Sequence, residues 1–168
     1  HTGKAVTLCF KPAAVNHGYK FQRVDLEDAP TIAADVNRVV STNRGTTLQS
    51  GEVQISTVEH VLSALVGLGL ANILLEVDGP EIPILDGSAH GFIDILEQAG
   101  REEQEGDREY FEVTEPIAYK DEVTGSEILA IPAEEYQLTT MIDFNSPILG
   151  HQYASLDHLT QYKEEIAP

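Results

Sequence analysis

The sequence predicts an α+β fold in two parts, a first domain at residues 1–100 and an incomplete second domain at residues 110–168. Short alternating or aliphatic runs, typical of strands, precede one long apolar helix pattern at residues 58–69. A similar order, strands and then a helix, recurs near the end of the chain. Between them, residues 101–109 carry no aliphatic side chain, which indicates an acidic linker.

In the first domain, alternation and turn residues predict strands, and one turn with Gly51 predicts a hairpin. The predicted strands cover residues 5–10, 19–24, part of 31–40, 46–49, 52–55 and 71–77. Two helices are predicted, at residues 58–69 and 89–99. Ser88 is placed to cap the second helix, and Gly100 is placed to end it.

The second domain shows weaker strand patterns and one closing helix. The predicted strands cover residues 110–113, 116–120, 128–131 and 136–144. The apolar spacing of Leu156, Leu159, Tyr162 and Ile166 predicts the helix. No repeat between the two domains is visible in the sequence.

Composition excludes several classes of partner. Lys and Arg number 10 against 28 Asp and Glu, a net charge of −18, which argues against nucleic acid or an anionic membrane as the partner. No apolar stretch is long enough to span a bilayer, so we expect no stable membrane insertion. The single cysteine, Cys9, favours a reducing, cytoplasmic setting. The chain starts at His1 without Met, and both ends are expected to be cut.

The start of the first helix carries an acid and an imidazole side by side, Glu59 and His60. Ser56 followed by Glu59 matches a capping box, in which each side chain satisfies a backbone N–H of the other residue. On that interpretation Glu59 is structural and His60 is an ordinary histidine. The alternative is that both side chains belong to a functional site.

The opposite face of this helix favours the functional interpretation. One side is an aliphatic stripe suited to packing on a sheet, while the other carries His60, Ser63, Ala64 and Gly67. A solvent-facing helix normally carries long polar side chains there. Small residues allow a close approach, so we expect another helix or domain to cover this face, with Glu59 and His60 at the mouth of a cleft.

As a metal motif the pair is incomplete. Ser63 and Ala64 exclude the H-E-x-x-H pattern, and Ser56 excludes H-x-x-E-H. A catalytic zinc site requires three protein ligands, and His60 supplies one. The other internal histidines are predicted to be surface residues; they are His17, His90, His151 and His158.

Longer motifs resemble those of the UDP-3-O-acyl-N-acetylglucosamine deacetylases, zinc enzymes of lipid A synthesis. The matching segments are residues 1–4 (HTGK), 55–69 (ISTVEHVLSALVGLG), 81–89 (EIPILDGSA) and 142–147 (IDFNSP). The resemblance extends over essentially the whole chain. It implies two similar domains, each a two-layer sandwich of mixed sheet plus helices, packed helix to helix.

The resemblance also implies roles for individual residues. His60 matches the first Zn²⁺ ligand, and Glu59 matches the general base that activates water for attack on the N-acetyl carbonyl. Thr46, Thr47 and Leu48 match a loop that lines the substrate pocket, and we expect His1 to lie there too. The implied substrate is a UDP-linked acylated amino sugar, and a monomer is expected unless the protein is fused to a dehydratase.

We identify no counterpart in this chain of the remaining two zinc ligands, a His and an Asp four residues apart on a later helix. Residues 1–168 alone are therefore expected to be inactive. Two alternatives stay open. One is a non-catalytic scaffold or binding domain, and the other is part of a bifunctional deacetylase and 3-hydroxyacyl-[acyl-carrier-protein] dehydratase.

Overall fold

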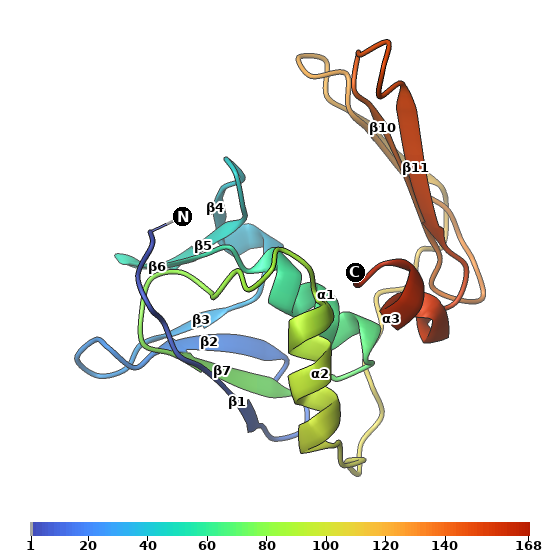
Figure 1. Ribbon diagram of the computed structural model, residues 1–168. Helices are drawn as coiled ribbons and strands as arrows, with labels where there is room; N and C mark the ends of the chain where they lie inside the picture. The colour runs from blue at the N-terminus through green and yellow to red at the C-terminus, as the bar shows by residue number, and fades with distance from the viewer. Residues whose placement is uncertain (1) are drawn as a thin grey trace.

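A mixed four-stranded sheet forms the base of the first hundred residues in the computed structural model, which describes residues 2–168 (Figure 1). Its strands, in spatial order, are β1 (Leu8–Pro12), β7 (Ile73–Val77), β2 (Tyr19–Arg23) and β3 (Thr31–Ala33). Strand β7 runs antiparallel to β1 and parallel to β2. The predicted mixed sheet is confirmed, with β1 beginning three residues later than expected.

A second, antiparallel sheet of three strands follows β3. It contains β4 (Val39–Ser41), β5 (Thr47–Ser50) and β6 (Val53–Ser56), and a 3-10 turn, η1 (Val36–Arg38), precedes it. The predicted hairpin is confirmed, since Ser50 pairs with Val53 and Gln49 with Gln54. The strand expected within residues 31–40 is interrupted by the 3-10 turn.

One buried guanidinium connects the two sheets. Arg23 at the end of β2 is only 7% exposed, and its Nη1 donates to the carbonyl of Gln54 in β6 at 2.8 Å. Its Nε and Nη2 donate to the two carboxylate oxygens of Asp25 at 2.8 and 2.7 Å. This bidentate pairing lets a charged side chain remain buried between the sheets, because both of its polar edges are hydrogen-bonded.

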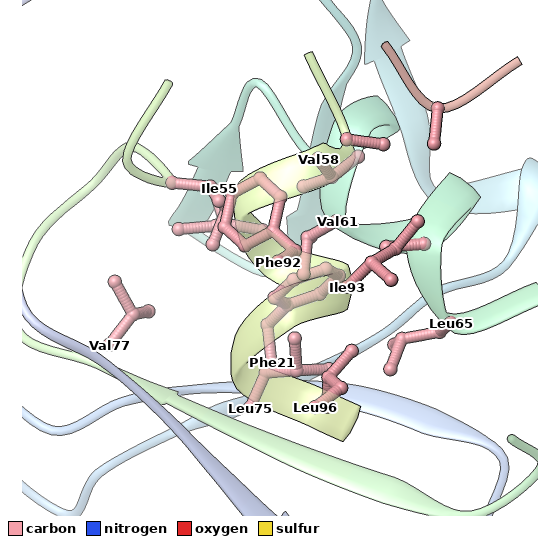
Figure 2. Packing of buried hydrophobic residues seen from close by; sticks show 14 of the residues in the cluster. Phe21, Ile55, Val58, Val61, Leu65, Leu75, Val77, Phe92, Ile93 and Leu96 are labelled. Atoms are coloured by element: carbon pink, nitrogen blue, oxygen red, sulfur yellow. The ribbon is translucent and has the colours of Figure 1, made fainter. Parts of the chain in front are cut away.

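Two helices, α1 (Glu59–Gly67) and α2 (His90–Ala99), cover the sheet. In Figure 2 the side chains of Phe92, Ile93 and Leu96 from α2 lie among residues of α1 and of the sheet strands. The fully buried members include Phe21, Leu75, Val61 and Leu65. Helix α1 turns its aliphatic stripe toward this core, as the sequence predicts. For α2 the sequence predicts Ile95 on the packing side with Phe92 and Leu96, but Ile93 is buried there and Ile95 is exposed. Gly100 ends α2 with φ 77°, also as predicted.

The acidic segment 101–109 lies along the first part of the chain. The guanidinium of Arg101 donates to the carbonyl of Leu68 at 3.2 Å, and the amide of Gln104 donates to the carbonyl of Ala13 at 2.8 Å. The amide of Asn72 also donates to Gln104, at 2.8 Å. The segment is therefore held by polar contacts, and the division at residues 1–100, 101–109 and 110–168 stays a prediction.

Beyond the acidic segment the chain forms two antiparallel hairpins that extend away from the helices (Figure 1). One pairs β8 (Ile117–Lys120) with β9 (Glu127–Ala130), and the other pairs β10 (Leu138–Asp143) with β11 (His151–Leu156). The strand expected at residues 110–113 is wrong, because Tyr110 and Phe111 are exposed and pair with no strand. Strand β11 was not predicted.

The closing helix is shorter than predicted. A 3-10 turn, η2 (Leu159–Gln161), leads into a single helical turn, α3 (Tyr162–Glu165). Leu156 belongs instead to β11, where it pairs with Leu138. The helical spacing was misleading because hairpin pairing places Leu156 at the end of a strand. Of the helices in residues 2–168, none has the length and apolar character needed to cross a membrane.

Candidate active site

Two residues separate the end of β6 from the start of α1. Thr57 and Val58 join them, both buried, and Glu59 is the first helical residue. Thr57 has φ 60°, in the left-handed region that β-branched residues rarely adopt. The sharp turn at Thr57 directs the chain from the sheet into α1 and brings Glu59 and His60 to the outer end of the helix.

The capping box expected from Ser56 and Glu59 is wrong. Val58 occupies the N-cap position and makes no side-chain cap, while the Ser56 hydroxyl donates to the carbonyl of Pro80 at 3.1 Å. Ser56 also pairs with Glu81 in an isolated parallel bridge. Residues 80–82 therefore hold Ser56 in extended backbone, so it cannot cap a helix that starts three residues later.

The carboxylate of Glu59 is held by a neighbouring strand. Its Oε2 accepts a hydrogen bond from the backbone N–H of Thr46 at 2.8 Å. The other oxygen, Oε1, lies beside Gly45, where an added Cβ would come within 3.1 Å of it. One carboxylate oxygen is thus anchored to the segment before β5, and the other faces the imidazole of His60.

The two candidate functional side chains lie close without a hydrogen bond between them. His60 Nε2 and Glu59 Oε1 are 3.9 Å apart, and the side chains are 29% and 37% exposed respectively. At this separation, His60 Nε2 and Glu59 Oε1 can both contact one atom or small molecule placed beside them. This arrangement suits a ligand and a base acting on one small molecule.

A cavity of about 340 Å³ opens at this point between the two parts of the chain. Glu59, His60 and Ser63 of α1 line one side. The turn before α2 lines another with residues 87–89, and residues 166–168 form the third. The backbone joins the last two sides, because the Ala89 N–H donates to the Ala167 carbonyl at 2.9 Å.

The small-residue face of α1 is covered, as the sequence predicts. The ring of Tyr162 in α3 lies over Gly67, where a Cβ would be 2.0 Å from Tyr162 Cδ1. The Tyr162 hydroxyl hydrogen-bonds Ser63 Oγ at 2.5 Å, and burial raises the pKa of this phenol. Lys163 adds an ion pair with Glu97 of α2 at 2.5 Å.

The remaining predicted pocket residues differ in their surroundings. Thr46 and Thr47 are half-buried, with Thr46 directly beside Glu59 through its backbone. Leu48 is 3% exposed and packs in the hydrophobic core, so its side chain faces away from solvent. His1 lies outside the described residues. A substrate contact for any of them stays a prediction.

The described residues provide only part of a set of metal ligands. Within residues 2–168, no three His, Cys, Asp or Glu side chains gather closely enough to hold a metal ion. The donor set fits zinc only in part, because His60 offers one imidazole and a catalytic site requires three protein ligands. A zinc site that used His60 would therefore need further ligands.

Contrary to the expectation from the sequence, the chain does contain a His and an Asp four residues apart after His60. They are His90 and Asp94 on α2, 3.7 Å apart and about half exposed. His90 lines a neighbouring cavity with Asp86, and the described side chains form no metal cluster that joins this pair to His60. The His90–Asp94 spacing therefore does not provide further ligands for a metal ion bound at His60.

Comparison with known proteins decides the family. The chain matches the family model of LpxC, UDP-3-O-acyl N-acetylglycosamine deacetylase, over residues 1–168. The chain belongs to the LpxC family. It is 44% identical over 167 residues to a bifunctional enzyme LpxC/FabZ of Bacteroides thetaiotaomicron, covering 99% of this chain and 36% of that protein.

Two further LpxC relatives are named as deacetylases. The chain is 40% identical over 170 residues to the UDP-3-O-acyl-N-acetylglucosamine deacetylase of Methylococcus capsulatus. It is 38% identical over 171 residues to that of Acidithiobacillus ferrooxidans. These alignments cover 99% of this chain and 55% of each relative, so the chain spans about half the length of these LpxC proteins.

Proposed function

We propose that the protein containing this chain removes the N-acetyl group of UDP-3-O-(3-hydroxyacyl)-N-acetylglucosamine, the committed step of lipid A synthesis. The observation that carries the proposal is the pairing of Glu59 and His60, 3.9 Å apart at a cavity, in a chain of the LpxC family. The cavity lies between the first part of the chain and its C-terminal segment, where a substrate can be enclosed.

In this proposal Glu59 is the general base. Its Oε1 is not held by the Thr46 N–H, and it takes a proton from the water that attacks the N-acetyl carbonyl. The Thr46 N–H fixes Oε2 and so limits rotation of the carboxylate, which keeps the proton acceptor in one position. The helix N-terminus also favours the ionised carboxylate, the form that a base requires.

His60 is the proposed zinc ligand. A bound zinc ion supplies Lewis acidity, which lowers the pKa of water and polarises a carbonyl. His60 presents Nε2 at the cavity, and the ligands beyond it are proposed to come from parts of the protein outside residues 2–168. We infer that residues 1–168 alone hold zinc weakly and are nearly inactive, because one imidazole competes poorly with water.

The experiment measures bound zinc and deacetylation of the UDP substrate for the full-length protein and for residues 1–168, side by side. We expect stoichiometric zinc and turnover in the former and neither in the latter. Full-length protein without either property would favour the alternative, a non-catalytic scaffold or binding domain. Stoichiometric zinc in residues 1–168 would refute the proposal that the other zinc ligands lie outside this part of the protein.

A second activity is favoured by a specific observation. The relatives at 41–44% identity from three organisms are named bifunctional enzymes LpxC/FabZ. We propose as a second candidate that the protein also dehydrates 3-hydroxyacyl groups on a carrier protein. Assay of the full-length protein with a 3-hydroxyacyl carrier protein tests it, and absence of dehydration would leave the deacetylase alone.

The remaining proposals concern the cellular location, the oligomeric state and the second domain of the protein. We propose a cytoplasmic protein, in line with the single cysteine, Cys9, which is free. A monomer is proposed unless a dehydratase is fused to it. We also propose that residues 110–168 begin a second α+β domain whose hairpins are completed by further chain.

A further inference from the structure

A buried carboxylate that the proposed mechanism does not use lies directly under the start of α1. Glu81 is 6% exposed, and its Oε1 accepts a hydrogen bond from the Thr57 hydroxyl at 3.1 Å. Its Oε2 accepts from the backbone N–H of Thr2 at 2.7 Å. Burial raises the pKa of the Glu81 carboxyl, while hydrogen bonds, those from Thr2 and Thr57 among them, lower it.

The backbone around Glu81 is fixed against the same junction. The Ser56 N–H donates to the Pro80 carbonyl at 2.9 Å, and the Ile82 N–H donates to the Ser56 carbonyl at 3.0 Å. These two bonds flank Glu81 and align residues 80–82 beside the end of β6. The carboxylate consequently has little freedom, and it accepts a hydrogen bond from a residue of this junction whose backbone lies in the left-handed region.

That residue is Thr57, which is 2% exposed and has φ 60°. A β-branched side chain rarely adopts the left-handed region, and such residues persist where their surroundings hold them. Among the described residues, the Thr57 hydroxyl donates its hydrogen bond to Glu81. A glycine would relieve the backbone but would remove this contact.

The two residues beyond Thr57 connect the junction to the catalytic side chains. The Val58 N–H donates to the Thr46 carbonyl at 3.4 Å, and Glu59 accepts from the Thr46 N–H at 2.8 Å. Thr46 thus bonds both residues that follow Thr57. A rotation of the Thr57 backbone would move α1's first turn and break this pair of bonds.

We propose that Glu81 and Thr57 are positioning residues that set the orientation of Glu59 and His60 from beneath the first turn of α1. This inference rests on the proposed deacetylase function for its catalytic consequence. Neither residue touches the reacting atoms, and both act through the backbone between residues 56 and 60. A purely stabilising role would instead lower the melting temperature and leave turnover per folded molecule unchanged.

The test uses full-length protein with Thr57→Val and Thr57→Ser. Valine keeps the shape of threonine and lacks the hydroxyl, whereas serine keeps the hydroxyl. We expect Thr57→Val to lower kcat at least about tenfold with KM within about threefold, since small displacements of catalytic groups are costly. Thr57→Ser should stay within about threefold of wild type in both. Thr139→Val, on exposed strand β10, is the matched control.

A second readout does not depend on activity. The hydrogen-exchange rate of the Thr46 amide reports whether Glu59 still accepts its N–H. We expect Thr57→Val to raise this rate at least about tenfold while amides of β2 and β7 keep theirs. If wild-type protein has no deacetylase activity, the proposed function fails. The exchange rate of the Thr46 amide would still show whether Thr57 positions Glu59.

Glu81→Gln keeps the inference testable if Thr57→Val does not fold. The bonds from Thr57 and Thr2 go to different carboxylate oxygens, and glutamine has an acceptor oxygen at only one of these positions. We expect Glu81→Gln, like Thr57→Val, to lower kcat and to raise the exchange rate of the Thr46 amide. Equal kcat and equal Thr46 exchange in Thr57→Val and Thr57→Ser, or wild-type values of both in Glu81→Gln, would overturn the inference.

Discussion

The backbone N–H of Thr46 donates to the carboxylate of Glu59 at 2.8 Å, across thirteen residues of chain. The acid at the start of α1 is therefore anchored by the segment that enters β5, and its own helix receives no cap from it. A carboxylate held in this way keeps one oxygen fixed and the other directed toward His60. The carboxylate therefore makes no contribution to capping α1.

Replacement of Glu59 tests its role as the base. In full-length protein we expect Glu59→Gln to lower deacetylase turnover by about 10²–10⁴-fold, the range typical of general acid–base catalysis. Zinc content should stay near that of wild type, because the proposed ligand is His60. Glu52→Gln, in the exposed turn between β5 and β6, is the control and should keep wild-type turnover. Retention of most activity in Glu59→Gln would refute the assignment.

Replacement of His60 tests the metal side of the site. We expect His60→Ala in full-length protein to weaken zinc binding by at least about 10–100-fold, the effect already seen when only a supporting partner is lost. Metal analysis after dialysis against a weak chelator measures this. His151→Ala is the control, because His151 is exposed on β11. Unchanged zinc affinity in His60→Ala would exclude His60 as a ligand.

The packing of Tyr162 on Gly67 predicts an unusual cost for a small substitution. Gly→Ala within a helix normally stabilises by roughly 0.5–1 kcal/mol. Here the new methyl would overlap the Tyr162 ring, which has little room to move, so we expect a net loss of about 1–3 kcal/mol. Urea unfolding of Gly67→Ala measures it.

Gly91→Ala on α2 is the matched control for that substitution. The atom nearest to its new methyl is the end of the flexible, exposed Leu85 side chain, so Gly91→Ala should be neutral or slightly stabilising. In a Tyr162→Ala background the cost of Gly67→Ala should largely vanish. A cost that persists there would mean that Tyr162 is not its cause.

The Arg23–Asp25 pair predicts a pH-dependent stability. The hydrogen bond from the buried guanidinium of Arg23 holds the pKa of the Asp25 carboxyl below its usual range, against the opposing effect of burial. The pair therefore contributes stability above the unfolded pKa of about 3.9, and this contribution is lost as the pH falls through the lower folded value.

We expect Asp25→Asn to have a lower melting temperature than wild type at pH 7. The difference should shrink as the pH falls below about 4, where the wild-type carboxylate begins to take up a proton. Thermal melts between pH 7 and pH 2 measure it, and Asp107→Asn in the exposed acidic segment serves as control. A difference that stays constant with pH would contradict the assignment to ionised Asp25.

Local patterns predicted most elements of the first hundred residues and fewer of those beyond. The hairpin at Gly51, the mixed sheet and both helices follow from alternation, turn residues and helical stripes, which are local signals. The closing helix was overestimated because Leu156 fits a helical spacing but pairs with Leu138 across a hairpin. Pairing between strands depends on residues that are distant in the sequence, so no local pattern encodes it.

For the site, the sequence by itself determined which residues could carry chemistry: Glu59 beside His60, and a small-residue face that needed a cover. The tertiary structure decided how they are held. Ser56 was expected to cap the helix, but its pairing with residues 80–82 removes it from that role, and Thr46 binds Glu59 instead. The cover is the ring of Tyr162, ninety-nine residues from its hydrogen-bond partner Ser63. Residue types and spacings fix the donors and acceptors available, whereas their pairing depends on segments that only the folded chain brings together.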